Sequence, residues 1–177
     1  MDTLISTALK NGADSADIIN VRDIPFRREF RAACVQNMCG KFGTCWMCPP
    51  DIGDIDELIA IAKQYSHMLV FCTIGLLEDS FDIEGMSKCA AEHNRITVKI
   101  ADKLPEIFDS KLVLGAGACQ ICETCSRPFN EPCRYPKRAI APMEAYGIAV
   151  SELAASCGMD YTNGQHTVTY FGGILLK

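Results

Sequence analysis

Eleven cysteines, an odd number, stand out in this chain of 177 residues, and most of them fall in two short stretches. The first stretch has C-x4-C-x5-C-x2-C spacing and contains Cys34, Cys39, Cys45 and Cys48. The second has C-x2-C-x2-C spacing with one more cysteine further on, and contains Cys119, Cys122, Cys125 and Cys133. Thiols stay reduced in the cytosol, so clustered cysteines there favour metal binding or catalysis over disulfides.

The second stretch carries the stronger indication of an iron-sulfur cluster. Three closely spaced thiolates suit three corners of a 4Fe-4S cube, and a more distant cysteine supplies the fourth iron. In the first stretch Gly40 and Gly43 would let the chain bend closely around a cluster, and Trp46 or Phe42 could shield it from water. The two sets of four predict two 4Fe-4S clusters, and an exchange of ligands between the loops stays open.

Zinc is the alternative metal. The pairs Cys45/Cys48 and Cys122/Cys125 could each contribute half of a four-thiolate site. A zinc ribbon would place these pairs about 15 to 20 residues apart, whereas about 70 residues separate them here and four further cysteines are left over. Two complete sets of four account for more of the residues.

The other reactive side chains have structural explanations. Three cysteines, Cys72, Cys89 and Cys157, fall within a predicted strand or helix, where cysteine commonly behaves as a small hydrophobe. The histidines His67, His93 and His166 lie at unrelated positions, so we expect no histidine ligand and no catalytic group among them. A basic group, Arg134, Lys137 and Arg138, could offset cluster charge or lie on a solvated face.

The two cysteine stretches need a scaffold, and the apolar pattern predicts helices alternating with strands. Expected helices cover residues 2–10, 54–66, 84–108 (ended or kinked by Pro105) and 142–157, and expected strands cover 16–21, 68–77, 111–117 and 167–176, with a further extended stretch at 24–33. This order predicts a single α/β domain spanning 1–177, a sandwich of a mixed sheet with helices, in which both cysteine loops leave strand ends.

The composition restricts the class of protein. Hydrophobic residues make up 49% and charged residues 22%, which is typical of a globular domain, and no apolar run is long enough to span a membrane. Asp2 stands where a signal peptide would carry positive charge, so we expect a cytoplasmic protein. A net charge of -5 argues against nucleic acid as the partner.

Four segments, ACVQNMCGKFGTCWMCPP, LGAGACQICETC, PCRYP and PMEAYGI, give the chain a resemblance to a known family. It resembles cysteine-rich predicted metal-binding proteins found mainly in anaerobic bacteria and archaea, over nearly its whole length. The resemblance implies metal binding and an anaerobic setting, and it supplies no reaction.

These observations favour an electron carrier over an enzyme. In the leading hypothesis two 4Fe-4S clusters pass single electrons to a redox protein partner, and the protein tunes the clusters through hydrogen bonds and solvent exposure. A second hypothesis is a redox enzyme or reductive activator with an open cluster site, which a missing cysteine ligand in the first loop would indicate. The third is a zinc-stabilised interaction module. A homo-oligomer is compatible with all three.

Overall fold

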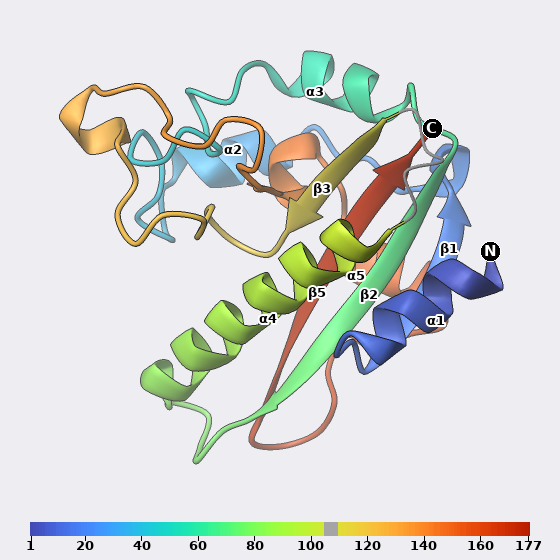
Figure 1. Ribbon diagram of the computed structural model, residues 1–177. Helices are drawn as coiled ribbons and strands as arrows, with labels where there is room; N and C mark the ends of the chain where they lie inside the picture. Colours follow the sequence, from blue (N-terminus) through green and yellow to red (C-terminus); the bar gives the residue numbers. More distant parts are fainter. Residues whose placement is uncertain (105–109) are drawn as a thin grey trace.

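The computed structural model describes residues 1–104 and 110–177 and is built on one five-stranded mixed sheet of order β1-β2-β5-β3-β4 (Figure 1). The strands are β1 Ser15–Asn20, β2 His67–Leu76, β3 Lys111–Gly115, β4 Ala141–Pro142 and β5 Thr167–Leu176. All neighbours are antiparallel except β3 and β4, which are parallel. The predicted α/β class with a mixed sheet is confirmed.

The two long central strands are apolar because both of their faces are buried. In β2, Leu69 and Phe71 pack into one hydrophobic cluster and Met68 and Val70 into the other. Successive strand residues point to opposite faces. A continuous apolar run is therefore what a strand covered on both sides requires.

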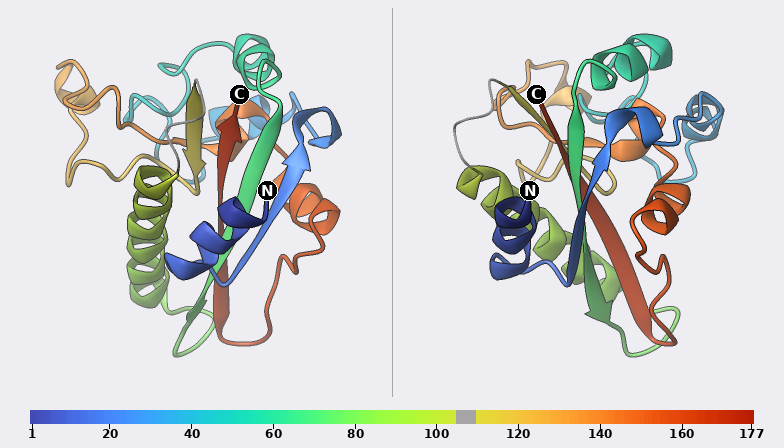
Figure 2. Two further views of the ribbon diagram at one scale, coloured as in Figure 1. Left: turned by 45° about the vertical axis from the view of Figure 1, so that its right-hand side comes forward. Right: turned by 90° about the vertical axis from the view of Figure 1, so that its right-hand side faces the viewer.

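Helices cover both faces of the sheet (Figures 1 and 2). On one face lie α1 Asp2–Lys10 and α4 Ile83–Lys103, which pack on β2 and β5 through one core cluster. The second cluster contains residues of α3 Ile55–Ala62, the 3-10 helix η3 Met143–Tyr146 and α5 Val150–Ser156. The fold is thus three layers, with the sheet in the middle.

Local signals explain where two of the helices begin. The carboxylate of Asp54 accepts a hydrogen bond of 2.8 Å from the backbone N–H of Asp56 at the start of α3. Asp82 accepts one of 2.7 Å from the N–H of Gly85 at the start of α4. Both are side-chain caps that satisfy N–H groups left free by the first helical turn.

Two predicted elements were wrong. The stretch 24–33 is extended only around Phe26, which forms an isolated bridge with Ile148, and α2 Phe30–Val35 follows. The first cysteine loop therefore leaves a short helix and not a strand. The predicted helix 142–157 is also wrong in its first half, because Pro142 belongs to β4 and Gly147, at φ 72°, ends η3 before α5 begins.

The remaining predicted bounds agree to within a few residues, except that α4 ends at Lys103. The expected continuation to Phe108 and the effect of Pro105 lie outside the described residues. Two short 3-10 helices, η1 Val21–Asp23 and η2 Arg127–Phe129, complete the fold.

Both cysteine loops lie at one end of the sheet (Figure 1). The first loop is defined here as residues 36–54, between α2 and α3, and the second loop as residues 116–140, between the parallel strands β3 and β4. Within the described part of the chain, no helix has the length and hydrophobicity needed to cross a membrane.

Candidate metal centres

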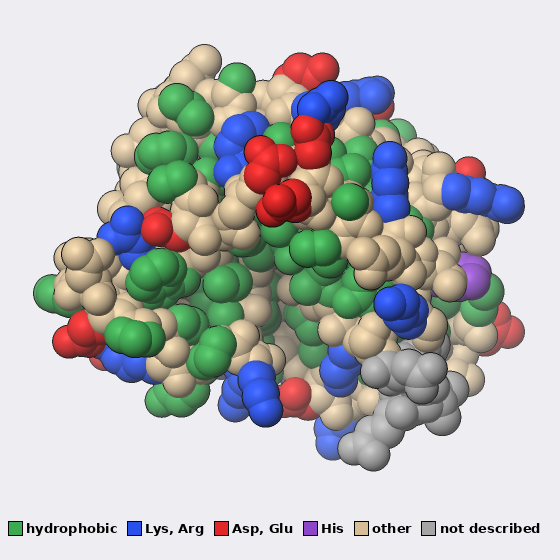
Figure 3. All heavy atoms as spheres, turned by 90° about the horizontal axis from the view of Figure 1, so that it is seen from above, with side chains coloured by type: hydrophobic (Ala, Val, Ile, Leu, Met, Phe, Trp, Pro, Cys, Tyr) green, Lys and Arg blue, Asp and Glu red, His purple; other side chains and the backbone are tan. Residues whose placement is uncertain are grey.

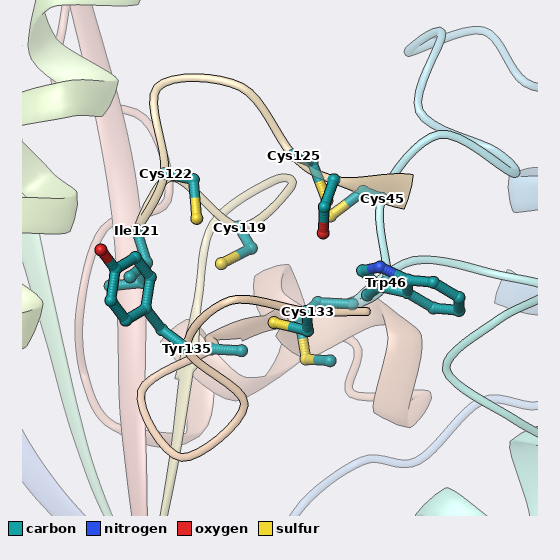
Figure 4. A pocket seen from close by; sticks show the side chains of 11 residues that line it. Cys45, Trp46, Cys119, Ile121, Cys122, Cys125, Cys133 and Tyr135 are labelled. Carbon is teal, nitrogen blue, oxygen red and sulfur yellow. The ribbon is translucent and has the colours of Figure 1, made fainter. Parts of the chain in front are cut away.

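Five cysteines line one cavity between the two loops, which we call the second-loop site. They are Cys119, Cys122, Cys125 and Cys133 of the second loop and Cys45 of the first. Their sulfur atoms point towards a common space, with Trp46 on one side and Tyr135 and Ile121 on the other (Figure 4). Four of the same cysteines also border an open groove of about 720 Å³, so the room for a group of several atoms lies on that side.

Cys45 is the residue at which the two sets of cysteines meet. It is only 3% exposed, and its sulfur accepts hydrogen bonds from the thiols of Cys48 and Cys125 and from the backbone N–H groups of Met47 and Cys119. These bonds, that of Cys48 foremost, lower the pKa of Cys45 to about 5 against the effect of burial. The same bond raises the pKa of Cys48, because Cys48 is then held as the donor. One thiolate is thus stabilised at the junction of the loops.

The other three predicted ligands line a separate cavity, which we call the first-loop site. Cys34, at the end of α2, lies there with Cys39 and Cys48. Gly40 and Gly43 turn the loop with φ angles of 69° and 68°, in the left-handed region that favours glycine. The chain therefore turns at these two glycines, whereas its bending around a cluster stays a prediction.

An arginine beside Cys34 has unused hydrogen-bonding groups. Arg31 precedes Cys34 by one helical turn, and its Nη1 donates to the carbonyl of Gly53 at 2.8 Å. Its Nε and Nη2 are buried and have no partner among the described residues. Burial raises the pKa of the Cys34 thiol, and the positive charge of Arg31 opposes that rise. Buried donors without a partner are costly, so the side chain fits an anionic group at this site.

A set of contacts joins the two loops next to the second-loop site. The guanidinium of Arg127 lies 5.2 Å from the ring centre of Trp46, and its Nε is 2.8 Å from Oδ2 of Asp51. The indole N–H of Trp46 donates to the carbonyl of Glu131 at 3.0 Å. These contacts fix the orientation of the first loop on the second, and with it the position of Cys45.

The aromatic residues expected near the cysteines are divided between the sites, since Trp46 lines the second-loop cavity and Phe42 the first-loop cavity. Of the cysteines expected in the core, Cys72 is buried in the hydrophobic cluster that contains Met68 and Val70, whereas Cys89 and Cys157 are half-buried. None of the three lines a cysteine-rich cavity of the described residues.

His93, expected to be a surface or satisfied histidine, is buried, and its Nε2 has no hydrogen-bond partner among the described residues. Its Nδ1 is 2.8 Å from the hydroxyl of Thr73, and burial lowers its pKa to about 4. It is therefore neutral near pH 7.

The basic group proposed from the sequence makes other contacts. Arg134 donates to the carbonyl of Thr124 at 2.8 Å, and Arg138 is 4.0 Å from Asp102. Three other cations lie near the cysteines, namely Arg31, Arg127 and Lys41, and none of them was expected from the sequence. A helix at 30–35 places Arg31 and Cys34 on one face, whereas the extended stretch that we predicted at 24–33 does not. The pairing of Arg31 with Cys34 was therefore missed.

Among the residues that the structure describes, no three Cys, His, Asp or Glu side chains converge tightly enough to hold one metal ion. The cysteines instead surround shared spaces. A cubane binds each thiolate at a different iron, and the donor sets of both sites consist of the thiols that such a cluster uses. Together with the orphaned donors of Arg31, the residues present fit an anionic iron-sulfur group.

Seen from the end that carries the loops, hydrophobic side chains gather around a hollow in the surface (Figure 3). The fold and these cavities define an α/β protein with cysteines gathered at one end. A family model described as "Predicted metal-binding protein (DUF2284)" matches residues 17–176. The match covers most of the chain, so the chain belongs to this family of predicted metal-binding proteins. Searches of curated proteins and of solved structures found no match.

Proposed function

We propose that this protein binds two 4Fe-4S clusters at the first-loop and second-loop sites and passes single electrons to a partner redox enzyme. The observation that carries the proposal is that all eight predicted cysteine ligands line two cavities that meet at Cys45 and Cys48. Adjoining clusters give an electron a short path from one site to the other.

The surroundings of the cysteines support a redox role. Trp46, Tyr135 and Phe42 line the sites, and hydrogen bonding by the backbone N–H groups of Met47 and Cys119 helps to lower the pKa of Cys45. Hydrogen bonds to sulfur and solvent exposure are the terms by which a protein sets the potential of its cluster. The cluster then supplies the electron chemistry, and these residues tune it.

The test is a metal analysis of the full chain purified without oxygen. Iron, acid-labile sulfide and zinc are measured per chain, with the visible spectrum recorded before and after dithionite. We expect about eight irons and eight sulfides and a brown absorbance that dithionite bleaches. One or two zinc ions per chain, with no iron and no colour, would instead establish the zinc-stabilised interaction module.

Electron transfer needs its own measurement. The dithionite-reduced protein is freed of reductant and mixed with cytochrome c, an acceptor whose reduction is visible. We expect one electron delivered for each reduced cluster. A protein with eight irons that releases no electrons to any added acceptor would contradict the carrier role and leave the clusters with a structural one.

A further inference from the structure

The first-loop site has three thiols and not four. Cys34, Cys39 and Cys48 line its cavity, whereas Cys45 lines the second-loop cavity, where it contacts Cys125, and touches the first-loop site only through Cys48. Cys45 is almost fully buried in that position. The contacts of Trp46 and Asp51 with Arg127 hold the chain on both sides of Cys45 against the second loop.

The first-loop cavity is larger than a cluster. Its volume is about 400 Å³. A 4Fe-4S core has eight atoms, and at the ~30 Å³ that a water molecule takes, it would fill about 240 Å³. The cavity therefore has room for a cluster and for a small molecule beside it.

The walls of this cavity have the character of a binding pocket for such a molecule. Most of the lining is apolar and comes from Phe30, Ala33, Met38, Phe42, Pro49, Ala118 and Pro142. Only Gln36, Lys41 and Glu144 bring longer polar or charged ends. An apolar pocket with a few polar groups is the usual form of a small-molecule site.

Two cations lie on or near the wall of the cavity. Lys41 lines the wall, and the buried Nε and Nη2 of Arg31, beside Cys34, have no partner among the described residues. Glu144 is the one carboxylate on the lining. Two cations against one carboxylate leave one positive charge, which a cluster held by three thiolates would offset. The anionic donor is therefore selected by the iron that lacks a cysteine and not by the charges of the wall.

We propose that the first-loop cluster is held by Cys34, Cys39 and Cys48 alone and that its fourth iron accepts an exchangeable ligand from this cavity. The ligand is a small organic anion with an apolar body and one thiolate or carboxylate donor. This inference rests on the proposed function, because it requires a cluster at the first-loop site.

The experiment uses the full chain, purified without oxygen, analysed for iron and reduced with dithionite. Electron paramagnetic resonance spectra are recorded during a titration with ethanethiol, and ethanol serves as the matched probe without a thiol. We expect a saturable shift in the signal of one cluster, the one that Cys39→Ser removes, and no shift with ethanol. The Cys45→Ser variant should keep this signal and its shift.

The apolar wall offers a matched pair of variants on α2. Ala33 and its neighbour Ala32 are both exposed, but only Ala33 lines the cavity. Ala33→Trp should fill the cavity and weaken the response to ethanethiol about tenfold or more, and Ala32→Trp should leave it unchanged. Iron content of both variants shows whether the cluster is still present.

Each other outcome overturns a distinct claim. Absence of iron contradicts the proposed function itself. Eight irons with no shift, together with loss of the first-loop signal in Cys45→Ser, would show four cysteine ligands and overturn the open site. A shift that arises only in Glu144→Gln would show that the Glu144 carboxylate occupies the fourth position, which also overturns the exchangeable ligand.

Discussion

Nε of Arg127 lies 2.8 Å from Oδ2 of Asp51, and this ion pair joins the two cysteine loops in a partly buried position, with side-chain exposures of 25% and 14%. Asp51→Ala or Arg127→Ala should each lower the free energy of unfolding by about 1–3 kcal/mol, because a partly buried charge loses its partner. Urea unfolding measures this cost. The exposed pair Glu84 and Lys88 on α4 is the control, and its removal should cost at most about 0.5 kcal/mol. Equal costs for the two pairs would contradict a special role of the junction.

The buried imidazole of His93 predicts a pH dependence of stability. Its pKa is lowered to about 4 from 6.5 by burial, so the unfolded chain binds this proton at higher pH than the folded chain does. Stability is therefore full above pH 6.5 and is lost as the pH falls from 6.5 to 4, by about 3 kcal/mol at most. Urea unfolding of the wild type and of His93→Asn at several pH values measures this loss. Losses of stability that arise from other groups are common to both proteins, so the difference between the two pH profiles gives the contribution of His93. Parallel pH profiles would show that His93 is not the cause.

Two neighbouring glycines in β5 should differ in their tolerance of a methyl group. A Cβ on Gly172 would lie 2.6 Å from ring atoms of the fully buried Phe71. Gly172→Ala should therefore cost about 2–3 kcal/mol, because the ring has no free space to move into. On Gly173 the Cβ would meet the terminal methyl of Met68, a flexible side chain, so Gly173→Ala should cost about 1 kcal/mol. Thermal unfolding ranks the two variants, and the reverse order would contradict this account of the packing.

The buried Cys72 should be separable from the ligand cysteines by metal content. Cys72→Ala leaves a small cavity in the hydrophobic cluster around Met68 and Val70, and it should lower the free energy of unfolding by about 1 kcal/mol. Iron per chain should stay as in the wild type, whereas Cys119→Ala should lower it. Iron analysis and urea unfolding of both variants test the distinction. Loss of iron in Cys72→Ala would place Cys72 among the metal-binding residues.

Arg31 should raise the reduction potential of the first-loop cluster. Reduction adds negative charge, and a nearby buried cation stabilises that charge. Arg31→Gln should therefore lower the midpoint potential, measured by a redox titration followed by electron paramagnetic resonance. The control is Arg95→Gln, since Arg95 is exposed on α4 and paired with Glu92. An unchanged potential in Arg31→Gln would remove Arg31 from the account of the site.

The features that the sequence predicted well are those that depend on local pattern or on burial from both sides. The apolar run at 68–77 predicted β2 correctly, because a short continuous apolar run is typical of a strand that is buried on both faces. The helix expected at 54–66 starts where α3 does, and Asp54 caps that start. The close spacing of Cys119, Cys122 and Cys125 brought these residues to one cavity, because a short loop cannot separate them.

The features that escaped prediction depend on contacts between distant segments. The bridge between Phe26 and Ile148 decides where the extended chain ends before α2. The position of Cys45 depends on the packing of Trp46 against Arg127, which no spacing within the first loop reveals. The division of the cysteines into groups of three and five follows from that packing. Which of them bind metal stays a prediction.

The central position of β5 affects the order in which this protein can mature during synthesis. Within the described sheet, β5 alone pairs with both β2 and β3 and so joins its two halves, yet it follows both cysteine loops in the chain. A ribosome therefore synthesises all eight cysteines of the two loops before the strand that aligns their scaffold. Until β5 pairs with both strands, the two cysteine loops are attached to halves of the sheet that are not yet joined.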